Sequence, residues 1–129
     1  MFRLVQVLNG NTQADIHILP NNNYLFLPGE AVTVKDGKLI STTSSVAPDY
    51  MILSYKSHSR FKKVNAQIVN ENSVFKVEYV GTIEPYLGMT VGISTFMVRS
   101  DAVTYNANGK GTVIGIDDDK RKVYVKFRK

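Results

Sequence analysis

The sequence AVTVKDGKLIS, residues 31–41, predicts a β-hairpin and with it the class of the fold. Two strand-like runs, Ala31 to Lys35 and Lys38 to Ser41, flank the pair Asp36-Gly37. An Asp-Gly pair between two such runs favours a two-residue type I′ turn, because both residues accept the positive φ angles that match the twist of the strands. We therefore expect a tight antiparallel hairpin with Asp36 and Gly37 at its tip.

Strand-like runs and turn residues alternate in the same way on both sides of this hairpin. Just before it, Pro28-Gly29 predicts a type II turn, because proline sets the first central φ angle and glycine accepts a positive φ at the second. Apolar residues at every second position, or short apolar runs, mark the other expected strands. These cover residues 2–8, 16–19, 24–27, 50–55, 64–69, 73–80, 102–105, 112–116 and 122–127, and residues 87–93 should run from a loop into one more strand.

Two further hairpins are expected where strands follow each other closely. Asn70-Glu71-Asn72 is a turn sequence, so the strands at 64–69 and 73–80 should pair in antiparallel fashion. The last hairpin, Thr112 to Phe127, should close the sheet, and along its second strand the apolar set should face the core. The apolar set is Val123, Val125 and Phe127, and the outward set is Lys122, Tyr124 and Lys126.

The composition of the whole chain agrees with an all-β fold. Among 129 residues, 47 are Val, Ile, Thr, Tyr or Phe, which suit a pleated sheet, and only 18 are Ala, Leu or Glu, the strong helix formers. Strands in an all-β domain must close or cover their edges. We therefore expect a single domain over residues 1–129, a small antiparallel β-barrel or sandwich of about ten short strands with little or no helix.

Several classes of function lack the residues that they need. The chain has no cysteine, which removes disulfides and thiolate chemistry, and His17 and His58 are its only histidines. No apolar run approaches the roughly 18 residues that span a bilayer. No nucleophile motif such as Gly-x-Ser-x-Gly and no carboxylate pair suited to acid–base work is present, so we expect no enzymatic activity, no cofactor and no membrane partner.

The polar residues most suited to chemistry have simpler interpretations. The run Asp117-Asp118-Asp119 offers the carboxylate oxygens that Ca²⁺ prefers, but it lacks the alternating ligands and the later glutamate of a calcium loop. We interpret it as the polar tip of the last hairpin and expect no metal site. His58 lies in a basic stretch and His17 lies mid-strand between two isoleucines, so both are expected to face solvent.

Positive charge is the feature that points to a partner. The chain has 16 Lys and Arg against 11 Asp and Glu, a net charge of +5. One basic cluster lies at residues 56–63 and the other on the last hairpin, where Tyr124 shares a face with lysines. Small barrels bind single strands of nucleic acid by stacking bases on aromatics in a basic groove, whereas a solvated basic face needs no partner. The candidate interaction surface consists of Lys120, Arg121, Lys122, Tyr124, Lys126 and Arg128.

A resemblance to a known family rests on residues 24–55. Phe26 to Leu39 combine a Pro-Gly-Glu turn, a strand and an Asp-Gly hairpin. A polar segment, Ser41 to Ser45, follows, and Val46 to Ile52 lead back into the expected barrel. This order of features resembles the small all-β head proteins of tailed bacteriophages, the capsid decoration or auxiliary capsid proteins. No contact motif is shared closely enough to carry the role of any family residue over to this chain.

The resemblance implies a structural virion protein that is made in the host cytoplasm and binds the major capsid protein on the outer face of the head. It leaves open whether the protein is a homo-oligomer. Two polar loops, residues 9–15 and 42–49, are the expected adhesive segments. The alternative interpretation is a small basic β-barrel that binds nucleic acid, and it rests on the positive charge described above.

Overall fold

The part of the chain that the structure describes consists of strands, turns and loops. The structure is a computed structural model, and it describes residues 1–7, 16–20, 26–55 and 63–129. These residues contain eleven strands and no helix, which confirms the all-β prediction. They therefore also contain no helix long and apolar enough to cross a membrane. The strands are β1 (Arg3–Val7), β2 (Ile16–Pro20), β3 (Ala31–Lys35), β4 (Lys38–Ser41), β5 (Tyr50–Tyr55), β6 (Lys63–Ile68), β7 (Ser73–Tyr79), β8 (Thr90–Ser94), β9 (Ala102–Tyr105), β10 (Gly111–Ile116) and β11 (Lys122–Phe127).

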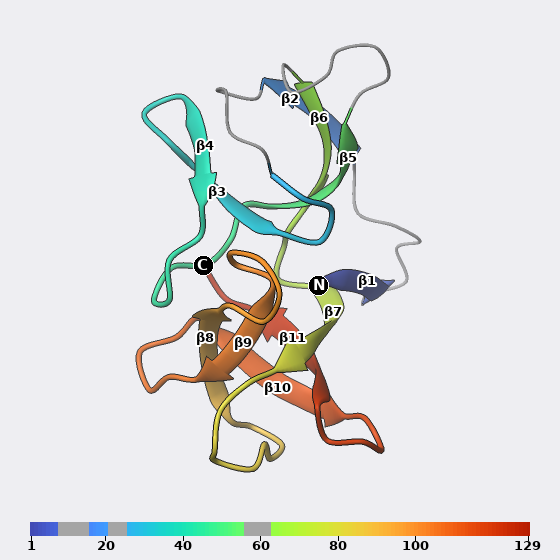
Figure 1. The fold of residues 1–129 in the computed structure, drawn as a ribbon, viewed down its shortest axis with the longest axis vertical. Helices are drawn as coiled ribbons and strands as arrows, with labels where there is room; N and C mark the ends of the chain where they lie inside the picture. Colours follow the sequence, from blue (N-terminus) through green and yellow to red (C-terminus); the bar gives the residue numbers. More distant parts are fainter. Residues whose placement is uncertain (8–15, 21–25, 56–62) are drawn as a thin grey trace.

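Five of the strands close into a small barrel, which fills the lower half of Figure 1. Their order is β7-β11-β10-β8-β9, and a parallel pairing of β9 with β7 joins the two ends. The other barrel pairs are antiparallel. Strand β1 lies along the same edge of β7 as β9, because β1 pairs with residues 73–76 and β9 with residues 78–79. Closure satisfies the backbone groups that an open sheet would leave at its edges.

The other five strands form a second antiparallel sheet, in the upper half of Figure 1. Their order is β2-β6-β5-β3-β4. This sheet has its own small apolar cluster, and burial of that cluster stabilises it. The buried members are Phe26, Val32, Leu39, Ile52, Val64 and Ala66.

The barrel core is larger and rich in valine and aromatic residues. The rings of Phe2, Phe75 and Phe127 contact one another at centroid distances of 5.9 to 6.4 Å. Ala31 and Met51, which belong to the second sheet, are buried in the same core. The two sheets therefore share apolar contacts, and the prediction of a single domain over residues 1–129 stays a prediction.

Both turns predicted around the first hairpin are confirmed. Asp36 and Gly37 have φ angles of 53° and 76°, the positive values that a type I′ turn requires, and Lys35 pairs with Lys38 across it. Gly29 has a φ angle of 85°, and the Glu30 amide donates to the Leu27 carbonyl at 3.1 Å. This is the hydrogen bond that closes a type II turn over Pro28-Gly29.

The predicted hairpin between residues 64–69 and 73–80 is wrong. Strand β6 pairs with β2 and β5 in the second sheet, whereas β7 pairs with β1, β11 and β9 in the barrel. Asn70 still makes a turn, since its carbonyl accepts the Ser73 amide at 3.1 Å. The turn passes the chain from one sheet to the other, because β6 pairs with the preceding strand β5 and with β2, whereas the partners of β7 are β1, β9 and β11 in the barrel.

The strand predicted at residues 24–27 is also not found in the two of these residues that the structure describes. Residues 24 and 25 lie outside the described residues, and Phe26 and Leu27 are not in a strand. The Leu27 amide donates to the Glu30 carboxylate at 3.2 Å, so it is used within the turn and not in a sheet.

Candidate interaction surfaces

Strand β11 alternates between core and surface as its sequence predicts. Val123, Val125 and Phe127 are buried in the barrel core. Lys122, Tyr124 and Lys126 lie on the opposite face and are partly exposed. The alternation places three of the six candidate residues on one side of one strand.

Neighbouring strands add two cations to this side of β11, and sequence reasoning missed both. In the register of the sheet, Arg3 on β1 pairs with Lys76 on β7, and Lys76 pairs with Tyr124 on β11. Paired residues point to the same face of a sheet. We call this set the basic face; it consists of Arg3, Lys76, Lys122, Tyr124 and Lys126.

Tyr124 lies at the centre of the basic face between β7 and β10. The Lys76 ammonium lies 5.6 Å from the centre of the Tyr124 ring, which is a cation–π contact. On the other side is Gly115, where an added Cβ atom would come within 3.0 Å of the ring. Gly115 therefore leaves the room in which the ring lies against the sheet.

The other three candidate residues are placed differently. Lys120 lies at the tip of the β10–β11 hairpin and forms an exposed ion pair with Glu84 at 2.6 Å. The hydrogen bond and charge of each partner lower the pKa of Glu84 and raise the pKa of Lys120. Arg121 is exposed beside them, and Arg128 donates to the Gly109 carbonyl at 3.0 Å. Lys120 and Arg121 thus belong to the hairpin tip, whereas the Arg128 side chain also lies 3.4 Å from Thr112, which pairs with Lys126 on β11.

A second feature is a pair of loops that carry large exposed apolar side chains. Residues 80–89 join β7 to β8, and residues 95–101 join β8 to β9. Met97 and Phe96 are 77% and 53% exposed, and Ile83 is 49% exposed. Solvent-exposed apolar groups that gather in one place are typical of surfaces that bind another protein. The two loops expose five large apolar side chains, which we call the apolar loop surface: Ile83, Tyr86, Leu87, Phe96 and Met97. Of these, Ile83 and Phe96 line one common hollow.

A buried carboxylate shapes the loop that carries Phe96 and Met97. Asp101 is 3% exposed, and its oxygens accept the backbone amides of Phe96, Met97 and Val98 at 2.7 to 3.0 Å. Burial alone would raise the pKa of Asp101, but these three amides and the nearby Met1 amine outweigh burial and lower it. The loop is thus tied to an anionic anchor, which holds the backbone that carries the two apolar side chains.

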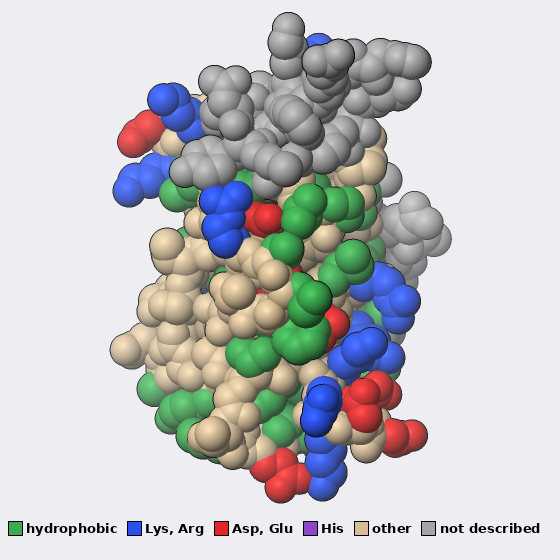
Figure 2. Space-filling view, in the orientation of Figure 1, with side chains coloured by type: hydrophobic (Ala, Val, Ile, Leu, Met, Phe, Trp, Pro, Cys, Tyr) green, Lys and Arg blue, Asp and Glu red, His purple; other side chains and the backbone are tan. Residues whose placement is uncertain are grey.

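The loop that carries Ile83 is anchored in a similar way. The Tyr79 hydroxyl donates to the Ile83 carbonyl at 2.5 Å, and burial raises the pKa of Tyr79, so the donor stays protonated. Ile83 and Phe96 line one open hollow of about 460 Å³, and the β10–β11 hairpin forms its other wall. Figure 2 shows hydrophobic side chains at the surface in the middle of the view, with charged residues gathered beside them at the lower right.

The remaining sequence candidates provide no chemical site in the described parts. His17 does not face solvent as predicted: it is partly buried, and its Nδ1 atom lies 3.0 Å from the Tyr50 hydroxyl. The reason is the register, which pairs His17 with buried Ala66 and turns Ile18 outward. Asp117 contacts Lys76 at 3.6 Å, and no three metal-ligating side chains gather in the described ranges. His58 and the basic cluster up to residue 62 lie outside those ranges.

The two expected adhesive loops have different outcomes. Residues 9–15 lie outside the described residues. In the segment 42–49, Asn106 donates to the Ser44 carbonyl at 3.2 Å, and Lys129 donates to the Pro48 carbonyl at 2.7 Å. The Ser100 hydroxyl also donates to the Thr42 carbonyl at 2.8 Å. This segment therefore joins the second sheet to the barrel, although residues 43–46 are exposed.

The geometry leaves two surfaces that are suited to binding, one apolar and held by loops, the other basic and held by strands. The apolar loop surface is suited to binding another protein, and the basic face is suited to binding an anion. They share the barrel as a scaffold. No family model matches the sequence, and no curated protein and no solved structure matches the chain.

Proposed function

We propose that this protein is a structural component of a virion, a decoration or auxiliary protein on the outer surface of a tailed-phage capsid. Its partner is the major capsid protein, and it acts by occupying surface, with no turnover. The resemblance of residues 24–55 supports the choice of partner. The apolar loop surface supports a function in protein binding and is the observation that carries the proposal.

The loops of this surface suit docking because they are ordered before a partner arrives. Asp101 and Tyr79 hold the backbone of the two loops, so little conformational entropy is lost when Phe96 and Ile83 are covered. A stable protein interface buries about 1,000 Å² or more in total, with aromatic and methionine side chains enriched at its centre. Phe96 and Met97 are side chains of these types, and Lys120 and Glu84 supply polar groups at the rim.

The many identical binding sites on a capsid are the second physical argument for the proposal. A capsid offers many identical sites, so each copy needs only a modest interface for the shell to be densely covered. A barrel with a fixed binding surface meets this requirement without any chemical centre. The second sheet then adds bulk outside the contact.

The test is co-sedimentation of the purified protein with undecorated phage heads. Wild-type protein should pellet with the heads, and the double variant Phe96→Ser, Met97→Ser should bind at least about tenfold more weakly, because central interface residues often contribute 2 kcal/mol or more. Both side chains are exposed, so the variant should keep its fold. The matched control is Ile18→Ser, which removes an apolar side chain of similar exposure from the second sheet.

Three results would count against this proposal. Wild-type protein that stays in the supernatant removes the capsid as partner. A double variant that binds as tightly as wild type removes the apolar loop surface as the contact. An equal loss in Ile18→Ser shows that the effect is not specific to the two loops.

A further inference from the structure

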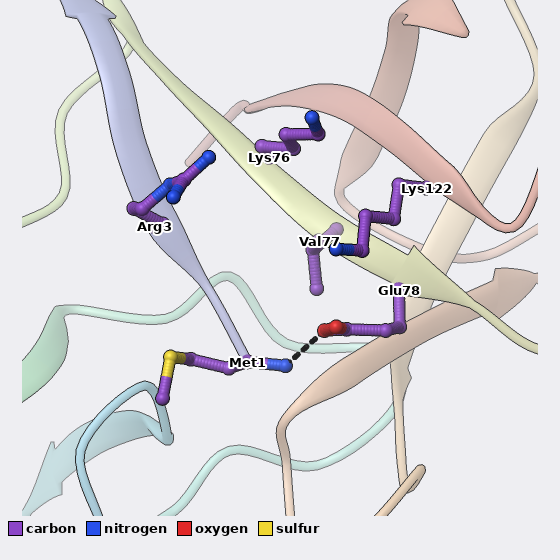
Figure 3. Close-up of a pocket in the computed structure, with 6 residues that line it drawn as sticks. All are labelled: Met1, Arg3, Lys76, Val77, Glu78 and Lys122. Carbon is purple, nitrogen blue, oxygen red and sulfur yellow. Dashed lines mark hydrogen bonds and ion pairs between the residues drawn. The ribbon is translucent and has the colours of Figure 1, made fainter. Parts of the chain in front are cut away.

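We propose that the basic face is a binding site for the phosphate groups of single-stranded nucleic acid. This inference concerns a different surface from the one that carries the proposed function. It starts from a hollow of about 90 Å³ on the outside of β1, β7 and β11, which Figure 3 shows in close-up. The hollow is lined by Met1, Arg3, Lys76, Val77, Glu78 and Lys122.

The positive charges at the hollow are in excess of what the protein itself neutralises. The Glu78 carboxylate accepts a hydrogen bond from the Met1 amine, and the Asp117 carboxylate contacts Lys76 at 3.6 Å. Arg3 and Lys122 have no ion pair or side-chain hydrogen bond with the described residues. In Figure 3 the Lys122 ammonium lies over β7 near Val77, and Arg3 lies on the other side of that strand. An anion placed between them meets two cations that pair with no carboxylate of the described residues.

The size of the hollow suits one small oxyanion. A water molecule needs roughly 10 to 15 Å³ of such space, so 90 Å³ accommodates a group of a few heavy atoms. A phosphate has oxygens on several sides, which allows Arg3 and Lys122 to bind it from opposite directions. Arginine also presents a planar fork of donors that matches two phosphate oxygens.

The basic face continues beyond the hollow along β11. Lys122 and Lys126 are four residues apart on one face of the strand, a distance of about 13 Å at roughly 3.3 Å per residue. This corresponds to about four stacked nucleotides at roughly 3.4 Å each. The face therefore has the length of a short single-strand site, and not that of a site for one isolated phosphate.

Tyr124 favours a nucleic acid over an acidic protein as the occupant. It lies between the two lysines, and a base has a flat π-surface that packs on such a ring. The Lys76 ammonium, 5.6 Å from the ring centre, adds positive charge to the centre of the basic face, and a base that stacks on the ring displaces this ammonium from it. A row of carboxylates has no group that would use the aromatic centre.

The test measures fluorescence anisotropy of a labelled twelve-residue oligothymidylate at 50 and 200 mM salt. Wild-type protein should bind, and the double variant Arg3→Gln, Lys122→Gln should bind at least about tenfold more weakly at 50 mM salt. The matched control is Lys35→Gln, Lys38→Gln, which removes the same charge from the β3–β4 hairpin and should change affinity less than twofold. For single strands the slope of log K against log salt is about −0.7 per phosphate contact, so the Arg3, Lys122 variant should reduce the slope by about 1.4.

Competitors identify the source of the anion. Inorganic phosphate at 10 mM, with ionic strength held constant, should displace little DNA, and a twelve-residue oligoglutamate should bind more weakly than the DNA. The proposal is overturned if the DNA does not bind at 50 mM salt, or if the two double variants lose affinity equally. It is also overturned if inorganic phosphate displaces the DNA fully or oligoglutamate binds more tightly. Binding by the Phe96→Ser, Met97→Ser protein should equal wild type, which separates this result from the capsid test.

Discussion

At the scale of single residues, Glu30 has an unusual environment for a carboxylate. Its side chain is 1% exposed at the junction of the two sheets, and it accepts hydrogen bonds from the Leu27 amide and the Ser41 hydroxyl. Burial raises the pKa of Glu30 above its ordinary value of 4.5, although these hydrogen bonds and Arg99 oppose the change. The folded protein therefore holds the Glu30 proton more tightly than the unfolded chain does.

This environment predicts a pH dependence of stability with a definite sign. Because the folded state binds the proton more tightly, the contribution of Glu30 to the free energy of unfolding is greatest below pH 4.5 and is lost as the pH rises through the raised pKa. In Glu30→Gln this loss should disappear, while the amide oxygen still accepts the Leu27 hydrogen bond. Urea unfolding between pH 4.5 and 7 measures the effect. A wild-type decline that is unchanged in Glu30→Gln would assign the pH dependence to other groups.

At the scale of elements, the β3–β4 hairpin depends on its two turn residues. Gly37 has a φ angle of 76°, and nothing lies within 4 Å of the position where a Cβ atom would be added. A substitution there meets no steric neighbour, so its effect comes from the backbone alone. A β-branched residue is strained at positive φ, whereas asparagine accepts it.

Gly37→Val should therefore destabilise the protein by about 1 kcal/mol or more. Gly37→Asn, which tests the same position without the strain, should lose clearly less. The midpoint of urea unfolding compares the two variants with wild type. Equal midpoints for Gly37→Val and wild type would show that the hairpin does not need a positive φ at its tip.

At the scale of the whole molecule, closure of the barrel depends on β11. This strand pairs with both β7 and β10, and its residues Val123, Val125 and Phe127 are buried in the barrel core. Without β11 the neighbouring strands would expose unpaired backbone groups, and the core would lose three large apolar side chains.

A chain that ends after Asp119 should therefore fail to fold cooperatively. The expected result is loss of the sigmoidal urea transition and binding of a dye that reports exposed apolar surface. A chain that lacks only Arg128 and Lys129 is the control and should unfold cooperatively. If the chain that ends at Asp119 were soluble and unfolded in one cooperative step, the last hairpin would be an appendage and not part of the closure.

What the sequence determined by itself is local. Asp36-Gly37 and Pro28-Gly29 specify their turns through allowed φ angles, and the alternation in β11 specifies which side chains are buried, because each depends on neighbours only a few residues away. The tertiary structure alone decided the partners of the strands. Asn70 makes a turn in either case, but the choice between a hairpin and a passage to the other sheet depends on contacts distant in sequence. For the same reason Arg3, Lys76 and Lys122 form one face only through the register of β1, β7 and β11, and Phe96 and Ile83 line one hollow only because the barrel closes.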